Sequence, residues 1–144
     1  MKLSTRTRYG IRAMLELAEN RSKMPLQIKT IAQRQDISIK YLEQLMALLK
    51  SAGFIRSVRG SKGGYVLAKS ADQIKLNDVF NCLEGPVTTA ECVENKSYCG
   101  RAADCVARGL WAEVQEAIVN VLQSITLQDL ADRAKGEKTM YYQI

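Results

Sequence analysis

The chain has 144 residues, of which 47% are hydrophobic, and a formal net charge of +6. This length suits one compact domain or a small domain with an oligomerisation arm, and the hydrophobic content can supply a core, so a disordered chain is excluded. No apolar run approaches a membrane span, and the first residues lack the apolar core of a signal peptide. We therefore expect a cytoplasmic protein that does not bind membranes.

The charge is divided unequally along the chain. Residues 1–69 contain fourteen Lys or Arg against four Asp or Glu, a net of +10, whereas residues 70–144 contain seven against eleven, a net of −4. A basic segment followed by an acidic one is typical of a nucleic-acid-binding domain joined to a part that does not touch the phosphates.

Residues 4–20 have the periodicity of a first helix. Its apolar positions face a core, and Arg6, Arg8 and Arg12 remain on the outside, where we expect them to contact backbone phosphates.

Two short helices follow across a tight turn. The first covers residues 26–34, and the second begins at the N-cap Ser38, buries Leu42, Leu45, Met46 and Leu49, and ends before Gly53. This arrangement predicts a helix-turn-helix whose second helix reads the major groove. The alternative is an ordinary amphipathic helix with a solvated polar face. The residues predicted to face DNA are Ser38, Lys40, Tyr41, Glu43 and Gln44.

Two β-prone segments, residues 54–59 and 65–67, are joined by a glycine-rich turn and predict a hairpin wing. At its tip, Arg59, Gly60, Ser61 and Lys62 are expected to enter a minor groove or contact phosphate. A helix over about residues 72–83 then closes a DNA-binding domain of residues 1–84. Cys82 belongs to its apolar set, and we favour a buried, inert thiol there.

Residues 85–104 lack an apolar stripe and carry turn-forming residues. Cys92, Cys99 and Cys105 lie in or beside this segment, at spacings unlike a CxxC zinc knuckle or a thioredoxin motif. In a reducing compartment, clustered thiols more often bind metal or react than form disulfides. Their spacing leaves open an iron–sulfur cluster, zinc, and redox-active or unpaired thiols.

Residues 105–144 are predicted to contain a long helix, reaching back to about residue 103 and ending near 124, then a short helix over residues 127–134 and a tail. So long an apolar strip favours pairing with the same helix of a second subunit, as in a reader of palindromic sites. Packing against its own domain only is the alternative. The predicted dimer contacts are Leu110, Val114, Ile118, Val121, Leu122 and Ile125. The expected fold is therefore mainly α with a small β-hairpin, a winged helix-turn-helix domain plus a long dimerisation helix.

An enzyme is not expected, because the chain has no histidine, no nucleophile–base motif, no phosphate-binding loop and no CxxC. A zinc-stabilised interaction module remains an alternative.

Several short segments together resemble bacterial winged helix-turn-helix regulators, the family that includes IscR, NsrR and CymR. The segments are Arg8–Gly10, Tyr41–Leu45, Val58–Gly60, Gly63–Tyr65, the three-cysteine loop, Leu110–Trp111 and Ile125–Leu127. This resemblance implies a homodimeric transcription factor that binds a palindromic site on double-stranded DNA, with crossed C-terminal helices and a cysteine loop at the dimer interface. For an IscR-like member it implies that Cys92, Cys99 and Cys105 bind a [2Fe–2S] cluster and that iron–sulfur biogenesis genes are controlled.

The fourth cluster ligand departs from the family pattern. IscR-like members have a histidine where this chain has Arg108, and NsrR-like members have an acidic residue where it has Arg8. The remaining candidates are Glu91, Glu94, Asp104 and Cys82. The alternative is a CymR-type repressor of cysteine and sulfur metabolism, controlled by a protein partner or by thiol oxidation, which the final Tyr-Tyr-Gln-Ile resembles.

Overall fold

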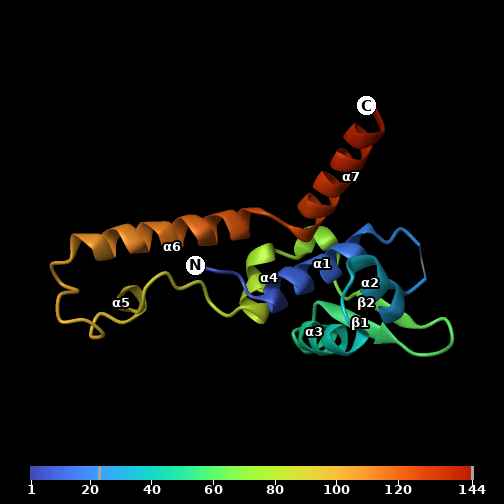
Figure 1. The fold of residues 1–144 in the computed structure, drawn as a ribbon, viewed down its shortest axis with the longest axis horizontal. Helices are drawn as coiled ribbons and strands as arrows, with labels where there is room; N and C mark the ends of the chain where they lie inside the picture. The colour runs from blue at the N-terminus through green and yellow to red at the C-terminus, as the bar shows by residue number, and fades with distance from the viewer. Residues whose placement is uncertain (23, 144) are drawn as a thin grey trace.

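The computed structural model describes residues 1–22 and 24–143, with the backbone alone for residues 138–143. Over these residues the chain forms seven α-helices, one 3-10 turn and one antiparallel hairpin (Figure 1), which confirms the predicted mainly α fold. The elements are α1 (Thr5–Glu19), α2 (Ile28–Gln35), α3 (Ile39–Ser51), β1 (Ile55–Val58), β2 (Gly64–Leu67), η1 (Ala71–Gln73), α4 (Leu76–Leu83), α5 (Glu91–Glu94), α6 (Val106–Ser124) and α7 (Leu127–Gln143).

Helices α1 to α4 and the hairpin enclose one hydrophobic core at one end of the molecule (Figure 1). Met14 of α1, Leu42 of α3 and Val79 of α4 are fully buried there. The recurrence of apolar residues every three or four positions turns one face of each helix inward, as the sequence predicts.

The start of α1 and the end of α4 meet at Glu84. Its carboxylate accepts hydrogen bonds from the hydroxyls of Ser4 and of the fully buried Thr7, and Ser4 also caps α1 by accepting from the Thr7 amide at 3.1 Å. These hydrogen bonds lower the pKa of Glu84, and the charge of Arg6 contributes to the same effect. The contact fixes α1 against α4.

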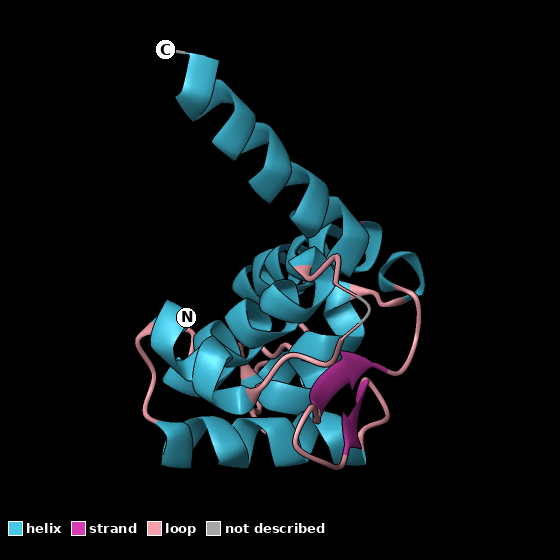
Figure 2. Cartoon of the chain, turned by 90° about the vertical axis from the view of Figure 1, so that its right-hand side faces the viewer, coloured by secondary structure: helices cyan, strands magenta, loops and turns pink. Residues whose placement is uncertain are grey.

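The hairpin pairs Ile55 with Leu67 and Val58 with Gly64. Outside it, Leu26 forms an antiparallel bridge with Tyr65, so the segment before α2 lies along the outer edge of β2. Figure 2 shows α3 along the bottom of the molecule with the two strands beside it.

Helix α6 extends away from the core as an arm (Figure 1), and none of its residues is buried. At its C-terminal end, Leu76 donates a backbone hydrogen bond to Ile125 at 2.9 Å and Leu127 donates one to Ile74 at 2.8 Å. The joint between α6 and α7 is therefore held against the start of α4. Neither α6 nor another helix in the described part of the chain combines the length and hydrophobicity needed to cross a membrane.

Helix α7 differs from the predicted short helix over residues 127–134, because it continues to Gln143. Gly136 lies inside it. A glycine in a helix costs only about 1 kcal/mol relative to alanine, and no proline follows to end the helix. Leu127 and Ala131 pack against the body, and the rest of the helix rises away from it (Figure 1). The side chains of the final Tyr-Tyr-Gln-Ile lie outside the described part of the chain.

Candidate nucleic-acid interface and cysteine loop

The turn between α2 and α3 is formed by Asp36, Ile37 and Ser38. Asp36 has a left-handed backbone (φ 53°, ψ 50°), which Asp tolerates better than most residues. Ile37 is buried in the core, and its amide donates to the Ala32 carbonyl at 3.0 Å. Ser38 then caps α3 by accepting from the Tyr41 amide at 3.2 Å. Two helices thus meet across a tight turn, as predicted.

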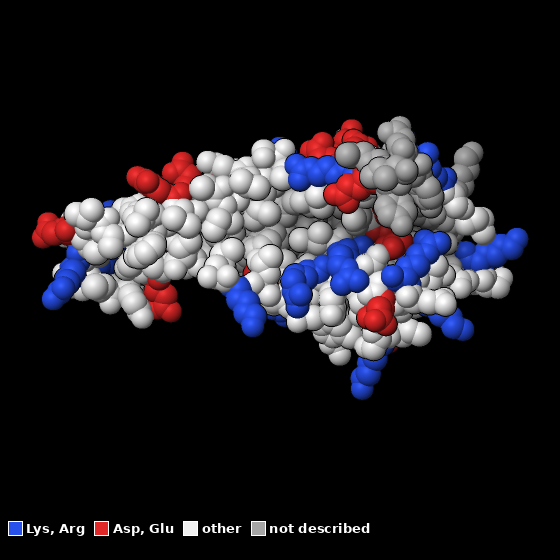
Figure 3. Space-filling model, turned by 45° about the horizontal axis from the view of Figure 1, so that its top comes forward, with Lys and Arg blue, Asp and Glu red and all other residues white. Residues whose placement is uncertain are grey.

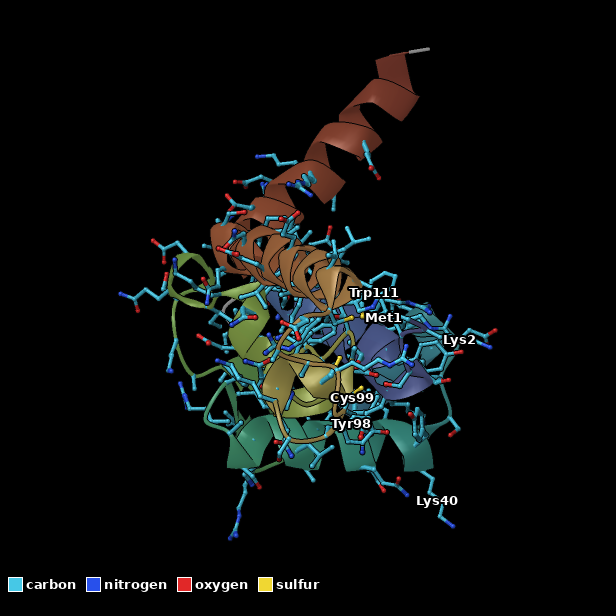
Figure 4. The ribbon with its side chains drawn as sticks, turned by 90° about the vertical axis from the view of Figure 1, so that its left-hand side faces the viewer. Met1, Lys2, Lys40, Tyr98, Cys99 and Trp111 are labelled. Carbon is cyan, nitrogen blue, oxygen red and sulfur yellow. The ribbon has the colours of Figure 1, made fainter. Side chains whose placement is uncertain are left out.

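The outward face of α3 carries the side chains predicted to meet base edges. Ser38, Lys40, Glu43 and Gln44 are exposed, and Lys40 points away from the body in Figure 4. Tyr41 differs, because it is half-buried and packs edge-on against Tyr9 of α1, with ring centroids 6.2 Å apart. Its ring belongs mainly to the contact between α1 and α3.

Arg12 also differs from the expectation of a free phosphate contact. Its guanidinium donates to the side chain and to the backbone carbonyl of Gln35, both at 2.7 Å, and lies 5.1 Å from the centroid of the Tyr9 ring. The Arg8 guanidinium lies 5.8 Å from the same centroid and donates no side-chain hydrogen bond to the described residues. Arg8 therefore stays available to a phosphate.

The wing is the hairpin β1–β2 with its turn, residues 55–67. Arg59, Gly60, Ser61 and Lys62 are exposed at its tip. Gly64 is required by close packing, because a Cβ there would lie 2.5 Å from the Leu26 carbonyl oxygen. The hydrogen bonds of the bridge, 2.8 and 3.0 Å long, join Tyr65 to Leu26. Sequence reasoning missed this bridge, since residue 26 carries no strand signal of its own.

A shallow hollow of about 370 Å³ separates the first turn of α1 from α3. Thr5 and Arg6 line one side, and Gln44 and Leu48 line the other. Sequence reasoning did not single out Thr5 or Leu48. The hollow adjoins the polar face of α3 and brings the cation of Arg6 beside it.

The basic residues gather on the globular end. On the face shown in Figure 3, lysines and arginines surround the body, whereas the arm is mostly uncharged along its middle. The basic side chains on this face are thus concentrated on the body, whereas acidic ones lie both there and on the arm.

The cysteine loop, residues 85–105, is attached to α6 through its first part. Thr89 donates through its amide to the side-chain oxygen of Gln115 at 3.1 Å and through its hydroxyl to the Trp111 carbonyl at 2.8 Å. The Gln115 amide nitrogen donates to Glu94 at 2.6 Å. One glutamine side chain thus holds both ends of residues 89–94.

Arg108 forms a second attachment. It donates to the backbone carbonyl of Cys92 at 2.7 Å and to that of Val93 at 3.5 Å. A guanidinium is a donor only. Arg108 therefore holds the backbone of the loop against α6 and cannot serve as a metal ligand.

The three loop thiols are free, with Cys92 half-buried and Cys99 and Cys105 exposed. Within the described residues, no three Cys, Asp or Glu side chains are gathered closely enough to hold a metal ion. Tyr98, beside Cys99 in Figure 4, bonds to the carboxylate of Glu91. Its pKa is raised chiefly by the Glu91 charge and that hydrogen bond, with smaller effects from burial and from Cys92 and Cys99.

The candidate fourth ligands have different surroundings. Glu91 is bonded to Tyr98 and Glu94 to Gln115, whereas Asp104 is exposed. Cys82 lies on α4 in the body, its thiol 3.8 Å from the Leu48 carbonyl of α3, and burial raises its pKa. The structure therefore places Cys82 on the body and not in the loop, and its side chain, predicted to be buried, is half-buried.

The apolar residues of α6 lie on two adjoining faces. Leu110, Val114 and Val121 of the predicted dimer set are exposed by 52%, 40% and 57%, and Val106 lies on the same face. Ile118 is half-buried, and Leu122 and Ile125 pack against the core of the body. The predicted strip therefore combines an exposed face with a face that holds the arm to its own domain.

A helix-turn-helix whose wing is bridged to it, on a basic body, defines a winged-helix DNA-binding protein. Residues 3–133 match the family Rrf2, described as an iron-dependent transcriptional regulator. The chain belongs to the Rrf2 family and is a DNA-binding transcriptional regulator.

Known proteins of this family are similar over nearly the whole chain. Protein rrf2 of Nitratidesulfovibrio vulgaris is 46% identical over 130 residues, covering 90% of this chain and 87% of the relative. The regulator CymR of Bacillus subtilis is 40% identical over 141 residues, covering 98% of this chain and 97% of the relative. Its solved structure has a TM-score of 0.80 at 41% identity and covers 92% of this chain and 98% of that chain. The structure of T. potens IscR has a TM-score of 0.78 at 38% identity and covers 99% of this chain and 97% of that chain. These relatives are regulators and not enzymes, as expected.

Proposed function

We propose that the chain acts as a homodimer that inserts two α3 helices into successive major grooves of a palindromic promoter site, and that the state of the cysteine loop modulates this binding. Support for the dimer comes from the exposed face of α6, where Val106, Leu110, Val114 and Val121 leave an apolar stripe in water. Burying this stripe against the same stripe of a second subunit removes apolar surface from water in a symmetric contact.

Within the proposed complex, Lys40 and Gln44 read base edges and Arg59 enters a flanking minor groove. Glu43 has a separate role. Its exposed carboxylate is repelled by phosphates, so it is tolerable where it accepts a hydrogen bond from cytosine N4 or excludes other bases. Arg8 and Lys62 contact phosphates and contribute to affinity without reading sequence.

We further propose that Cys92, Cys99 and Cys105 hold a [2Fe–2S] cluster and that the regulated genes serve iron–sulfur biogenesis. The donor set fits in its chemistry, because three thiols in one loop, two of them exposed and one half-buried, are the soft ligands that such clusters use. Glu91, Glu94 and Asp104 are the carboxylates available as a fourth ligand. A bound cluster supplies a centre that responds to oxidants and to iron supply.

The observation that carries the regulatory proposal is that the cysteine loop is hydrogen-bonded to α6, the same helix that carries the exposed stripe. Trp111, Arg108 and Gln115 hold residues 89–94 to α6 between the positions of Val106 and Val121. A rearrangement of the loop therefore acts directly on the helix that pairs the subunits, and the pairing sets the spacing of the two α3 helices.

A second candidate is metal-free control through thiol oxidation or a protein partner, in a repressor of sulfur metabolism. Two observations favour it: within the described residues no three Cys, Asp or Glu side chains are gathered closely enough to hold a metal ion, and Arg108, which is a donor only, holds the loop backbone through the Cys92 and Val93 carbonyls. The similarity to CymR supports it to the same extent as the similarity to IscR supports the cluster.

Anaerobic purification followed by visible spectroscopy and analysis for iron, sulfide and zinc distinguishes these candidates. The cluster predicts a coloured protein with iron and sulfide, whose chromophore is lost after Cys92→Ser, Cys99→Ser or Cys105→Ser and kept after Cys82→Ser. Persistence of the chromophore in all three loop variants would contradict the ligand assignment. Colourless protein with zinc identifies a structural metal site, and metal-free protein supports thiol or partner control.

The DNA-binding proposal is tested separately, with duplexes selected from a randomised pool in the presence of heparin. We expect enrichment of a palindrome and a dimer in light scattering. Arg59→Ala should lower the slope of log affinity against log salt by about 1 for each subunit, because one phosphate or groove contact per subunit is lost. A monomer with no preference for any duplex over heparin would overturn the proposal.

A further inference from the structure

Arg12 lies on the surface of α1, contacts the end of α2 directly, and reaches the start of α3 through the rings of Tyr9 and Tyr41. We propose that Arg12 is a positioning residue, which fixes the orientation of α3 and thereby its sequence discrimination, and that it does not bind a phosphate. The inference rests on the proposed placement of α3 in the major groove.

The first contact is with the C-terminal end of α2. The last carbonyl groups of a helix have no partner within the helix and carry its negative dipole end. The Arg12 guanidinium donates 2.7 Å hydrogen bonds to the backbone carbonyl of Gln35, the last residue of α2, and to its side-chain oxygen. Arg12 thus caps α2 from another helix, one residue before the left-handed Asp36.

The second contact reaches α3 through two aromatic rings. Arg12 lies 5.1 Å from the centroid of Tyr9, and Tyr9 packs edge-on against Tyr41 in the first turn of α3. A guanidinium over an aromatic ring is attracted by the negative face of the ring. The same side chain therefore fixes the end of α2 and supports the beginning of α3, on both sides of the turn.

The partner of Arg12 is itself held in place. The Gln35 amide nitrogen donates to Glu16 of α1 at 2.5 Å, and Arg34 forms an ion pair with Glu16 at 3.3 Å. The Glu16 side chain is only 11% exposed. Both polar ends of the Gln35 amide are thus engaged, which orients its oxygen toward Arg12.

Replacing arginine by lysine separates positioning from phosphate binding. Lysine keeps the positive charge and binds phosphate as a point charge, but it cannot donate two hydrogen bonds in the fixed geometry of a guanidinium. Arg8 lies over the same ring without an acceptor among the described residues, so Arg8→Lys is the matched control.

The experiment compares Arg12→Lys, Arg8→Lys and the wild type on a duplex selected by the wild-type protein and on a scrambled duplex, over a series of salt concentrations. We expect Arg12→Lys to reduce the ratio of the two affinities roughly five- to tenfold, the size of a typical coupling between contacting residues. The slope of log affinity against log salt for Arg12→Lys should match that of the wild type. Arg8→Lys should leave the ratio of the two affinities unchanged, because a phosphate contact contributes equally to binding of both duplexes.

Gln35→Met provides a second, nearly isosteric variant that removes the side-chain acceptor. We expect it to lower discrimination, and to have little further effect in the Arg12→Lys background, since the two residues act through one contact. Circular dichroism and thermal melting check that the variants fold.

Unchanged discrimination in both Arg12→Lys and Gln35→Met would overturn the inference. A third variant, Arg12→Gln, is measured over the same salt series, and a lower salt slope with discrimination intact would also overturn it. Failure of the wild type to prefer its selected duplex would instead count against the proposed function. The two failures are therefore distinguishable.

Discussion

Leu26 and Tyr65 exchange two backbone hydrogen bonds, from the Tyr65 amide at 2.8 Å and from the Leu26 amide at 3.0 Å. Leu26 precedes α2, and Tyr65 lies in β2 of the wing. The wing is therefore continuous with the helix-turn-helix through main-chain bonds, and its position relative to α3 depends little on side chains.

Gly64→Ala should loosen this bridge. The added methyl group would lie 2.5 Å from the carbonyl oxygen and 2.6 Å from the carbonyl carbon of Leu26, and backbone atoms cannot move aside cheaply. We expect a loss of about 3 kcal/mol in the free energy of unfolding and a fall in Tm of about 10 °C, measured by thermal melting.

Gly60→Ala in the same wing is the control. Gly60 has a positive φ of 112°, but among the described residues no atom lies within 4 Å of the position that an added methyl group would take. Only the backbone strain applies, so we expect a loss of about 1 kcal/mol. Equal losses in the two variants would show that close packing at Leu26 is unimportant.

Glu84→Gln should make stability less dependent on pH in the acid range. The hydrogen bonds from Ser4 and Thr7 lower the pKa of Glu84 in the folded protein, so its stabilising contribution is fully present above the ordinary value of 4.5 and is lost as the pH falls through the folded value. At neutral pH the variant should melt about 3 °C below the wild type.

The measurement for Glu84 is a series of melting curves from pH 7 to pH 3. The difference between wild type and Glu84→Gln should shrink as the pH falls. Thr7→Val removes one donor without changing shape much, and should show a smaller difference with the same sign. A gap that widens in acid would contradict the assignment.

Val114→Glu should separate the subunits. Val114 lies on the exposed stripe of α6, and a symmetric contact would bring two added carboxylates together in an apolar surface. We expect a monomer in light scattering, unchanged helix content, and DNA affinity lowered about a hundredfold or more through loss of bivalency. Gln123→Glu adds the same charge away from the stripe, and should remain dimeric.

Arg108→Ala should release the cysteine loop from α6. Two backbone carbonyls lose their donor, and Tyr98, 63% exposed in the same loop, is a site for chymotrypsin. We expect cleavage after Tyr98 to accelerate roughly fivefold, because its rate follows the population of the open loop. Arg101→Ala removes an exposed cation from the same loop and leaves both Arg108 hydrogen bonds in place, so it should be cleaved at the wild-type rate.

Local sequence patterns predicted much of the helix-turn-helix and the wing. Ser38 before an apolar stripe at helical spacing located the start of α3, and the stripe itself identified Leu42, Leu45, Met46 and Leu49 as buried. These signals lie within one helix, where spacing alone decides which side chains share a face. The glycines between the β-prone segments located the wing in the same way.

Contacts between distant segments could not be predicted in this way. Whether Arg12 faces a phosphate or Gln35 depends on how α1 crosses α2, which no local period records. The exposed and packed faces of α6 also look alike in sequence, so one role is predicted for Val121 and Leu122, although their environments differ. The role of the loop thiols stays a prediction, as does the choice of a fourth ligand.

The backbone hydrogen bonds of Ile125 and Leu127 with the start of α4 hold one end of the arm, so a small rotation there moves its other end much further. Nineteen helical residues form a rod about 28 Å long, held at one end by Ile74 and Leu76 and joined at the other to Cys105. A tilt of α6 by about 5° at its held end moves the far end by about 2.4 Å for a rod of that length. Ångström-scale rearrangements among the thiols therefore correspond to very small rotations beside α4, the helix that also packs against α3.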